Sequence, residues 1–180
     1  MALARRPWTA WGMFSLCVGM LAASILLSIW AADRPDYNNM AYSIIFMALP
    51  VTGILIAHRQ PENRIAWILL SVGLIIQVGA VAEPYARYGL VLHPGSLPAA
   101  GVVAAIAGSL WVPAIGITGT YLLLLFPDGR LPSRRWRPVA WASGVTMGML
   151  VLLFVFSPGA LENTASPNPL GIEALAPPPW

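Results

Sequence analysis

The sequence predicts an all-α membrane protein with about five transmembrane helices, its N-terminus in the cytoplasm and its C-terminus outside. Of the 180 residues, 58% are hydrophobic and only 9% are charged, whereas a soluble domain has about 25% charged residues. The apolar residues form runs comparable in length with the roughly 20 residues needed to cross a bilayer. The arginines gather in alternate connections between these runs, as expected for cytoplasmic loops.

The first run, about residues 8–32, carries no charge and is expected to span the membrane. It follows Arg5 and Arg6, so it has the charge pattern of a signal peptide. Its length exceeds the roughly 7–15 residues of a signal core, and the alanines before Asp33 make a poor cleavage site. We therefore expect a retained membrane anchor.

The second run covers about residues 39–57 and contains Pro50 near its middle, where a proline removes a helix hydrogen bond and kinks the span. The third run covers about residues 65–82. Its Gln77 is the most polar side chain deep in any run, and we expect it to bond a neighbouring helix. No run has a charge in its middle, which disfavours a transporter, channel or proton pump.

The fourth run, about residues 99–126, is the longest, and its length and central Pro113 predict tilt or a kink. The fifth run, about residues 139–156, starts after Pro138, a position where the missing N–H costs least. Residues 1–158 are thus predicted to form a five-helix transmembrane bundle.

The remaining residues, 159–180, are rich in proline and contain no spanning run. They predict an extended or loosely ordered tail outside the cytoplasm. We expect this tail to be a truncated loop of a longer chain.

The arginines set the predicted orientation. With the N-terminus inside, eight of the ten lie in the cytoplasm, and only Arg34 and Arg87 lie outside. The cytoplasmic arginines beyond the first span are Arg59, Arg64, Arg130, Arg134, Arg135 and Arg137. Each is attracted to anionic lipid by about 1 kcal/mol. These six are therefore expected to contact lipid and to determine the topology.

The longest basic loop begins at a turn, Pro127-Asp128-Gly129, that ends the fourth run. Four arginines follow the turn before the chain becomes apolar again. The loop is too short to form the folded basic surface that nucleic acid or phosphate would need. We therefore expect no nucleic-acid partner.

No catalytic, cofactor or metal site is expected in these residues. His58 and His93 are predicted at opposite faces of the membrane, so they cannot share a metal or form a catalytic pair. The sequence has no glycine-rich phosphate loop. Cys17 lies within an apolar run and is expected to be a packed, inert thiol.

Small residues four apart lie on one face of a helix, where two backbones can approach closely. Such pairs occur in the fourth and fifth runs and involve Gly101, Gly108, Gly144 and Gly148. They predict helix packing, either within one bundle, which is the commoner outcome, or between two copies of the chain.

Three segments share an order with a known family. They are "AHRQPENRIAWILLSVGL" at 57–74, "LLFPDGRLPSRRWRPVAW" at 124–141 and "SPGALENTASPNPLGI" at 157–172. The first two each have a helix end, a proline with an acid, arginine and then a tryptophan where the chain re-enters the membrane. Together they resemble the N-terminal membrane region of sensor histidine kinases from actinobacteria, the high-GC Gram-positive bacteria, over roughly residues 52–172.

The resemblance implies the sensor module of a two-component signal-transduction kinase in a bacterial cytoplasmic membrane. It also implies a homodimer, and a response regulator reached only through a kinase domain. The chain has no ATP-binding motif and neither histidine lies in a phosphoacceptor context, so kinase chemistry is not assigned to these residues. The alternatives are a stand-alone membrane scaffold or interaction protein, or a subunit of a membrane transporter or membrane enzyme.

The connection between the third and fourth runs, residues 83–98, is the expected surface for contact with a cue. It contains Tyr85, Arg87, Tyr88 and His93. These side chains could bind a ligand, although aromatic residues also settle at a membrane interface without one.

Overall fold

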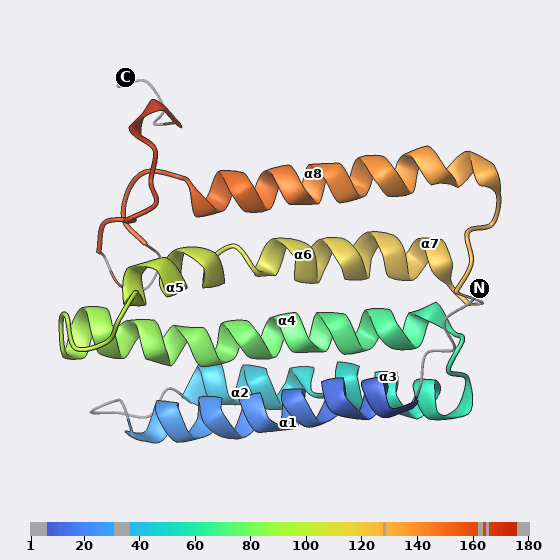
Figure 1. Ribbon diagram of the computed structural model, residues 1–180, viewed down its shortest axis with the longest axis horizontal. Helices are drawn as coiled ribbons and strands as arrows, with labels where there is room; N and C mark the ends of the chain where they lie inside the picture. Colours follow the sequence, from blue (N-terminus) through green and yellow to red (C-terminus); the bar gives the residue numbers. More distant parts are fainter. Residues whose placement is uncertain (1–6, 31–36, 128, 162–163, 165, 176–180) are drawn as a thin grey trace.

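The computed structural model describes residues 7–30, 37–127, 129–161, 164 and 166–175. Within these residues it confirms an all-helical protein, with five helical segments long and apolar enough to span a membrane (Figure 1). The segments are Trp8–Trp30, Tyr37–Arg59, Arg64–Leu92, Ala100–Leu125 and Arg134–Val155.

The first, third and fifth spans are each dominated by one long helix. These helices are α1 (Pro7–Trp30), α4 (Arg64–Arg87) and α8 (Arg137–Val155). A π-helical turn, η1 (Tyr88–Leu92), continues α4, and a 3-10 turn, η3 (Arg134–Trp136), precedes α8.

The second and fourth spans are assembled from shorter pieces. The second consists of α2 (Tyr37–Phe46) and α3 (Ala48–Arg59). The fourth consists of α5 (Ala100–Ala107), α6 (Trp111–Gly116), the π-helical η2 (Ile117–Leu122) and α7 (Leu123–Leu125). A short 3-10 turn, η4 (Glu173–Leu175), follows in the tail.

Both interrupted spans break just before a proline. Pro50 has no N–H to donate to the carbonyl four residues earlier, and the chain turns at Met47, whose N–H donates to Ile44 O at 3.2 Å. In the fourth span the turn precedes Pro113, and Val112 N donates to Ser109 O at 3.1 Å. The kinks expected from these two prolines are therefore present as helix breaks.

The helix α4 lies at the centre of the bundle. It packs against α1 and α3 on one side and against α5 and α6 on the other, while α8 lies outermost against α6 (Figure 1). In the most apolar window of each segment, 56% of the residues are buried in the α4 span but only 6% in the α8 span. Because lipid is as apolar as these side chains, an exposed α8 is compatible with a bilayer.

The two ends of the bundle differ in charge. One end, which we call the basic end, carries the exposed arginines Arg59, Arg64, Arg130, Arg134, Arg135 and Arg137. The opposite end, which we call the tail end, carries the last turns of α4 and the segment that follows α8 (Figure 1). The helix α1 begins at the basic end and α8 ends at the tail end.

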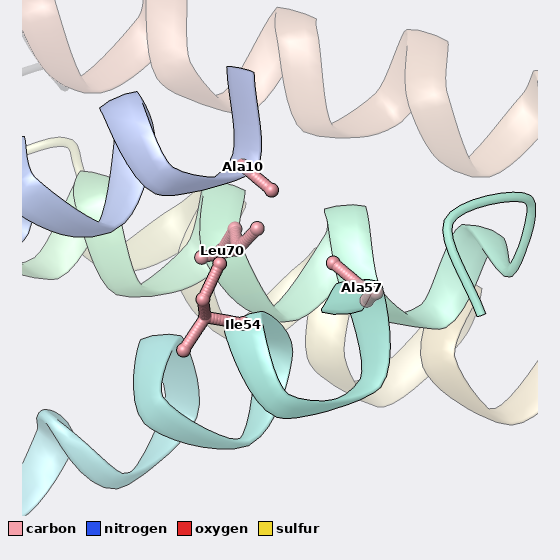
Figure 2. Close-up of a cluster of buried hydrophobic side chains, with 5 residues drawn as sticks. Ala10, Ile54, Ala57 and Leu70 are labelled. Atoms are coloured by element: carbon pink, nitrogen blue, oxygen red, sulfur yellow. The ribbon is translucent and has the colours of Figure 1, made fainter. Parts of the chain in front are cut away.

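The half of the bundle next to the basic end has a dry, close-packed core. Ala10 of α1, Ile54 and Ala57 of α3, and Ala66 and Leu70 of α4 are all buried there. Figure 2 shows Leu70 between the alanine of α1 and the two residues of α3. The alanines around Leu70 and Ile54 let three helices approach one another closely.

The third span extends beyond its expected end near residue 82. The helix α4 continues through Pro84 to Arg87, and η1 carries it to Leu92. Much of the connection expected at residues 83–98 is therefore helical, and the charged residues Glu83 and Arg87 lie on the central helix.

Candidate functional site

The basic end contains a loop in which two residues of the "PEN" segment, Pro61 and Asn63, accept hydrogen bonds that order the start of α4. Asn63 caps α4, its side-chain oxygen accepting from Ile65 N at 3.0 Å. Trp67 folds back and donates from Nε1 to Pro61 O at 3.0 Å. Glu62 is exposed. The segment therefore forms a capped start of α4, and the tryptophan stabilises the turn before it by a hydrogen bond.

The second basic loop packs directly onto the first through Gly129. This residue has a φ of 69°, and its N–H donates to Leu125 O at 2.7 Å. A Cβ at this position would lie 2.7 Å from Arg64 N and 3.0 Å from Asn63 Oδ1. Only glycine combines this backbone conformation with so close an approach. The two loops that carry the family resemblance thus form one contact.

The other residues expected at the basic end lie around this contact. Pro127 is exposed and follows a cis peptide bond from Phe126. Asp128 lies outside the described residues. The six arginines are exposed, which leaves their side chains available to lipid head groups.

The tail-end half of the bundle contains a layer of buried polar groups beside its hydrophobic residues. Pro84 lies within α4 and has no N–H for Ala80 O, which sits four residues earlier. Ser24 of α1 donates to that oxygen at 2.9 Å, and Asn39 of α2 donates to it at 3.1 Å. The proline is therefore accommodated by two neighbouring helices, as expected for a proline inside a transmembrane span.

Gln77 likewise donates to a carbonyl oxygen that has no donor in its own helix, at the break in the second span. It is fully buried, and its Nε2 donates to Ser43 O at 2.9 Å. Ser43 Oγ in turn donates to Asn39 O at 2.7 Å. The amide of Gln77 thus bonds a neighbouring helix, and its Oε1 has no hydrogen-bond partner among the described residues.

Next to this polar layer lies a cavity of about 720 Å³, which we call the tail-end hollow. Its walls come from α2, α4, α5, α6, the end of α8 and the segment after α8. Its lining includes polar, aromatic and small residues, among them Asn39, Tyr42, Ile76, Gly79, Glu83, Arg87, Leu110, Trp111, Ala114, Phe154, Thr164 and Asn168. On the side between α6 and α8, Trp111 and Phe154 meet edge to face with their ring centroids 5.2 Å apart.

The segment after α8 forms one wall of the hollow and is ordered by Asn168. Its Nδ2 donates to Val155 O and to Ser157 O, both at 2.9 Å, and its Oδ1 accepts from Leu170 N at 3.0 Å. Ile172 N also returns to Phe156 O at 3.0 Å. The described part of the tail is therefore folded back onto α8, whereas we expected an extended or loosely ordered segment.

The four residues expected to contact a cue do not form one site. Arg87 lines the tail-end hollow. Tyr85 donates from its hydroxyl to Pro98 O at 2.9 Å, and Tyr88 stacks at a tilt on His93 with centroids 4.6 Å apart. Tyr85 and the Tyr88–His93 pair thus brace the turn between η1 and α5.

The four glycines expected at helix contacts have different surroundings. A Cβ on Gly144 would lie 2.7 Å from the Tyr121 hydroxyl, and one on Gly101 would lie 3.0 Å from Pro169 of the tail. A Cβ on Gly108 would meet only the backbone of α5, and one on Gly148 would meet nothing within 4 Å. Within this chain, therefore, two of them face another segment.

Several residues of the hollow were not anticipated from the sequence, among them Glu83, Tyr42, Trp111, Phe154 and Asn168. One feature of the sequence could have indicated a polar site here. Glu83 and Arg87 are four residues apart at the end of an apolar run, so they lie on one face of a helix. Nothing along the chain indicates that α2, α6 and the tail meet α4 at this level. Among the described residues no group of three or more His, Cys, Asp or Glu side chains could hold a metal ion.

Comparison of the chain with protein-family models, with curated proteins and with solved structures gave no match. The resemblance to sensor histidine kinases therefore stays a prediction that depends on the three sequence segments.

Proposed function

We propose that this chain is the membrane input module of a sensor histidine kinase in a bacterial cytoplasmic membrane. The observation that carries the proposal is that α4 runs from one end of the bundle to the other. At one end this helix lines the tail-end hollow with Glu83 and Arg87, and at the other its first residue, Arg64, meets Gly129 of the second basic loop. One helix thus links a cavity on one side to a contact between loops on the other.

The polarity of the two ends supports an orientation for this module. The exposed arginines of the basic end favour the cytoplasm, and the hollow then faces the outer leaflet. A ligand that altered the packing of α4 in the hollow would shift the loop contact at the cytoplasmic surface. In a homodimer, such a shift would be passed to a kinase core, and from it to a response regulator.

Cysteine labelling tests the orientation. Cys17 is the only cysteine and is buried, so Cys17→Ser provides a background for single cysteines. Ser96 and Ser133 are both exposed, at the tail end and the basic end. In intact cells a membrane-impermeant maleimide is expected to label Ser96→Cys and to spare Ser133→Cys until the cells are opened. The reverse pattern would overturn the orientation.

Phosphohistidine chemistry tests the function. The whole reading frame that encodes these residues is expressed in membranes and incubated with radiolabelled ATP. We expect an acid-labile, alkali-stable phosphoprotein whose rate of formation changes in Gly129→Val, because a side chain there must displace Arg64. Gly12→Val is the matched control, since a Cβ there also meets nothing within 4 Å and Gly12 is not among the glycines expected at helix contacts. A full reading frame that forms no phosphohistidine would refute the proposal and favour a scaffold or a transporter subunit.

A further inference from the structure

We infer that the tail-end hollow binds a single-chain amphiphile with a zwitterionic head group that contains an amine and a phosphate, as in lysophosphatidylethanolamine. This inference rests on the proposed function in one respect only, in that it names the chemical class of the cue. The binding itself is a property of the hollow.

The hollow has the size and the lining of a ligand site. Its volume of about 720 Å³ lies within the roughly 300–1,000 Å³ typical of small-molecule pockets. Such pockets combine apolar and aromatic walls with a few polar groups. Here Tyr42, Trp111 and Phe154 supply the aromatic surface, and Thr164 lines the wall with a buried hydroxyl that has no partner among the described residues.

The polarity of the lining changes along the bundle axis. Toward the membrane centre the wall consists of Ile76, Leu110 and Ala114. Toward the tail end the wall includes the polar residues Glu83, Arg87 and Asn168, beside apolar residues of the segment after α8. On α4 alone, the distance from Ile76 to Arg87 is about 16 Å at the usual helix rise. An alkyl chain directed into the membrane and a head group at the tail end match this gradient.

The charged residues select the head group. Glu83 and Arg87 are four residues apart on α4, which places their Cβ atoms about 6 Å apart on one face of the helix. A carboxylate suits an ammonium group, and a guanidinium suits a phosphate. A zwitterion brings one charge of each sign, so it adds no net charge to a membrane site, whereas a purely anionic or cationic head would add one.

The space in the hollow comes from small residues, which allow a clean blocking variant. A Cβ on Gly79 would have only Leu110 Cδ1 near it, at 3.9 Å. Because Gly79 lines the hollow and its Cβ would have room, Gly79→Leu is expected to take up part of the cavity. Gly148→Leu, on the exposed face of α8, is the matched control.

The test uses the purified 180-residue chain in nanodiscs and a lysophosphatidylethanolamine with a brominated acyl chain, which quenches nearby tryptophans. Because other tryptophans face lipid, the signal is the difference between the wild type and Trp111→Phe. We expect this difference to saturate with lipid, with affinity about tenfold weaker in Gly79→Leu and unchanged in Gly148→Leu. Brominated lysophosphatidylglycerol and a brominated monoacylglycerol are expected to bind about tenfold more weakly than the zwitterion.

A second variant keeps the test decisive if Gly79→Leu does not fold. Glu83→Gln is expected to weaken binding of the zwitterion while leaving binding of the monoacylglycerol unchanged. Quenching that rises without saturation, or equal affinity for all three head groups, would overturn the inference. No kinase activity is measured, so a failure of binding and an absence of phosphohistidine are separate results.

Discussion

Near the basic end, Leu70 of α4 is fully buried against Ala10, Ile54 and Ala57, whereas further along the same helix Glu83 and Arg87 line a cavity of about 720 Å³. Both halves are rich in glycine and alanine, but they use them differently. In the first half, small residues let large ones and backbones come into contact. In the second half, small residues of α4 and α5 such as Gly79 and Gly108 line the cavity, and space remains between the helices.

A membrane bundle can thus be close-packed at one end and leave a cavity at the other. The close-packed half holds α1, α3 and α4 together, while the tail-end half holds its helices by hydrogen bonds to carbonyls that Pro84 and the break at Met47 leave without a donor in their own helix. Such polar contacts are specific but individually weak in membranes. Unfolding of three variants in mixed micelles, with rising dodecyl sulfate as denaturant, tests this difference between the two halves.

The largest effect is expected for Leu70→Ala. Its removal leaves a void between α1, α3 and α4, and the loss should be about 3 kcal/mol in the free energy of unfolding. Leu110→Ala is the control, because Leu110 is half-buried and borders a cavity that already exists. An equal cost for both substitutions would show that the two halves are packed alike.

An intermediate effect is expected for Gly73→Ala. A Cβ there would lie 2.5 Å from Cδ of Pro50, so α3 and α4 must separate, at a cost of about 2 kcal/mol. On the same helix, Gly79→Ala is expected to leave the free energy of unfolding nearly unchanged, because its nearest neighbour is 3.9 Å away. If Gly73→Ala were as harmless as Gly79→Ala, the close packing near the basic end would be refuted.

The smallest effect is expected for Ser24→Ala, whose hydroxyl bonds Ala80 O. Hydrogen bonds between transmembrane helices contribute about 0.6 kcal/mol on average. The loss should shrink when Pro84→Ala is also present, because residue 84 then has an N–H for the same carbonyl. Thr52→Ala is the control, since the hydroxyl of Thr52 bonds only its own helix. A loss from Ser24→Ala that Pro84→Ala left unchanged would exclude the proposed role of the proline.

Local features of the chain were predictable from the sequence where a local cause produces them. The breaks near Pro50 and Pro113 follow from a missing N–H, which acts within one helical turn. The bonding of Gln77 to a neighbouring helix follows from the cost of leaving an amide unpaired in an apolar span. The end of the third span was placed too early because Glu83, Pro84 and Arg87 predict a connection, while α1 and α2 supply the donors that let α4 continue.

The sequence by itself determined that the chain is helical and has five apolar segments of spanning length, because a bilayer requires each spanning backbone to satisfy its own hydrogen bonds. Only the tertiary structure decided that Gly129 meets Arg64, that Asn168 folds the tail onto α8, and that Glu83 faces a hollow. These features depend on which helices become neighbours. In a membrane that choice is made by packing and by a few hydrogen bonds, and the four-residue spacing of small residues does not show which helix becomes the neighbour.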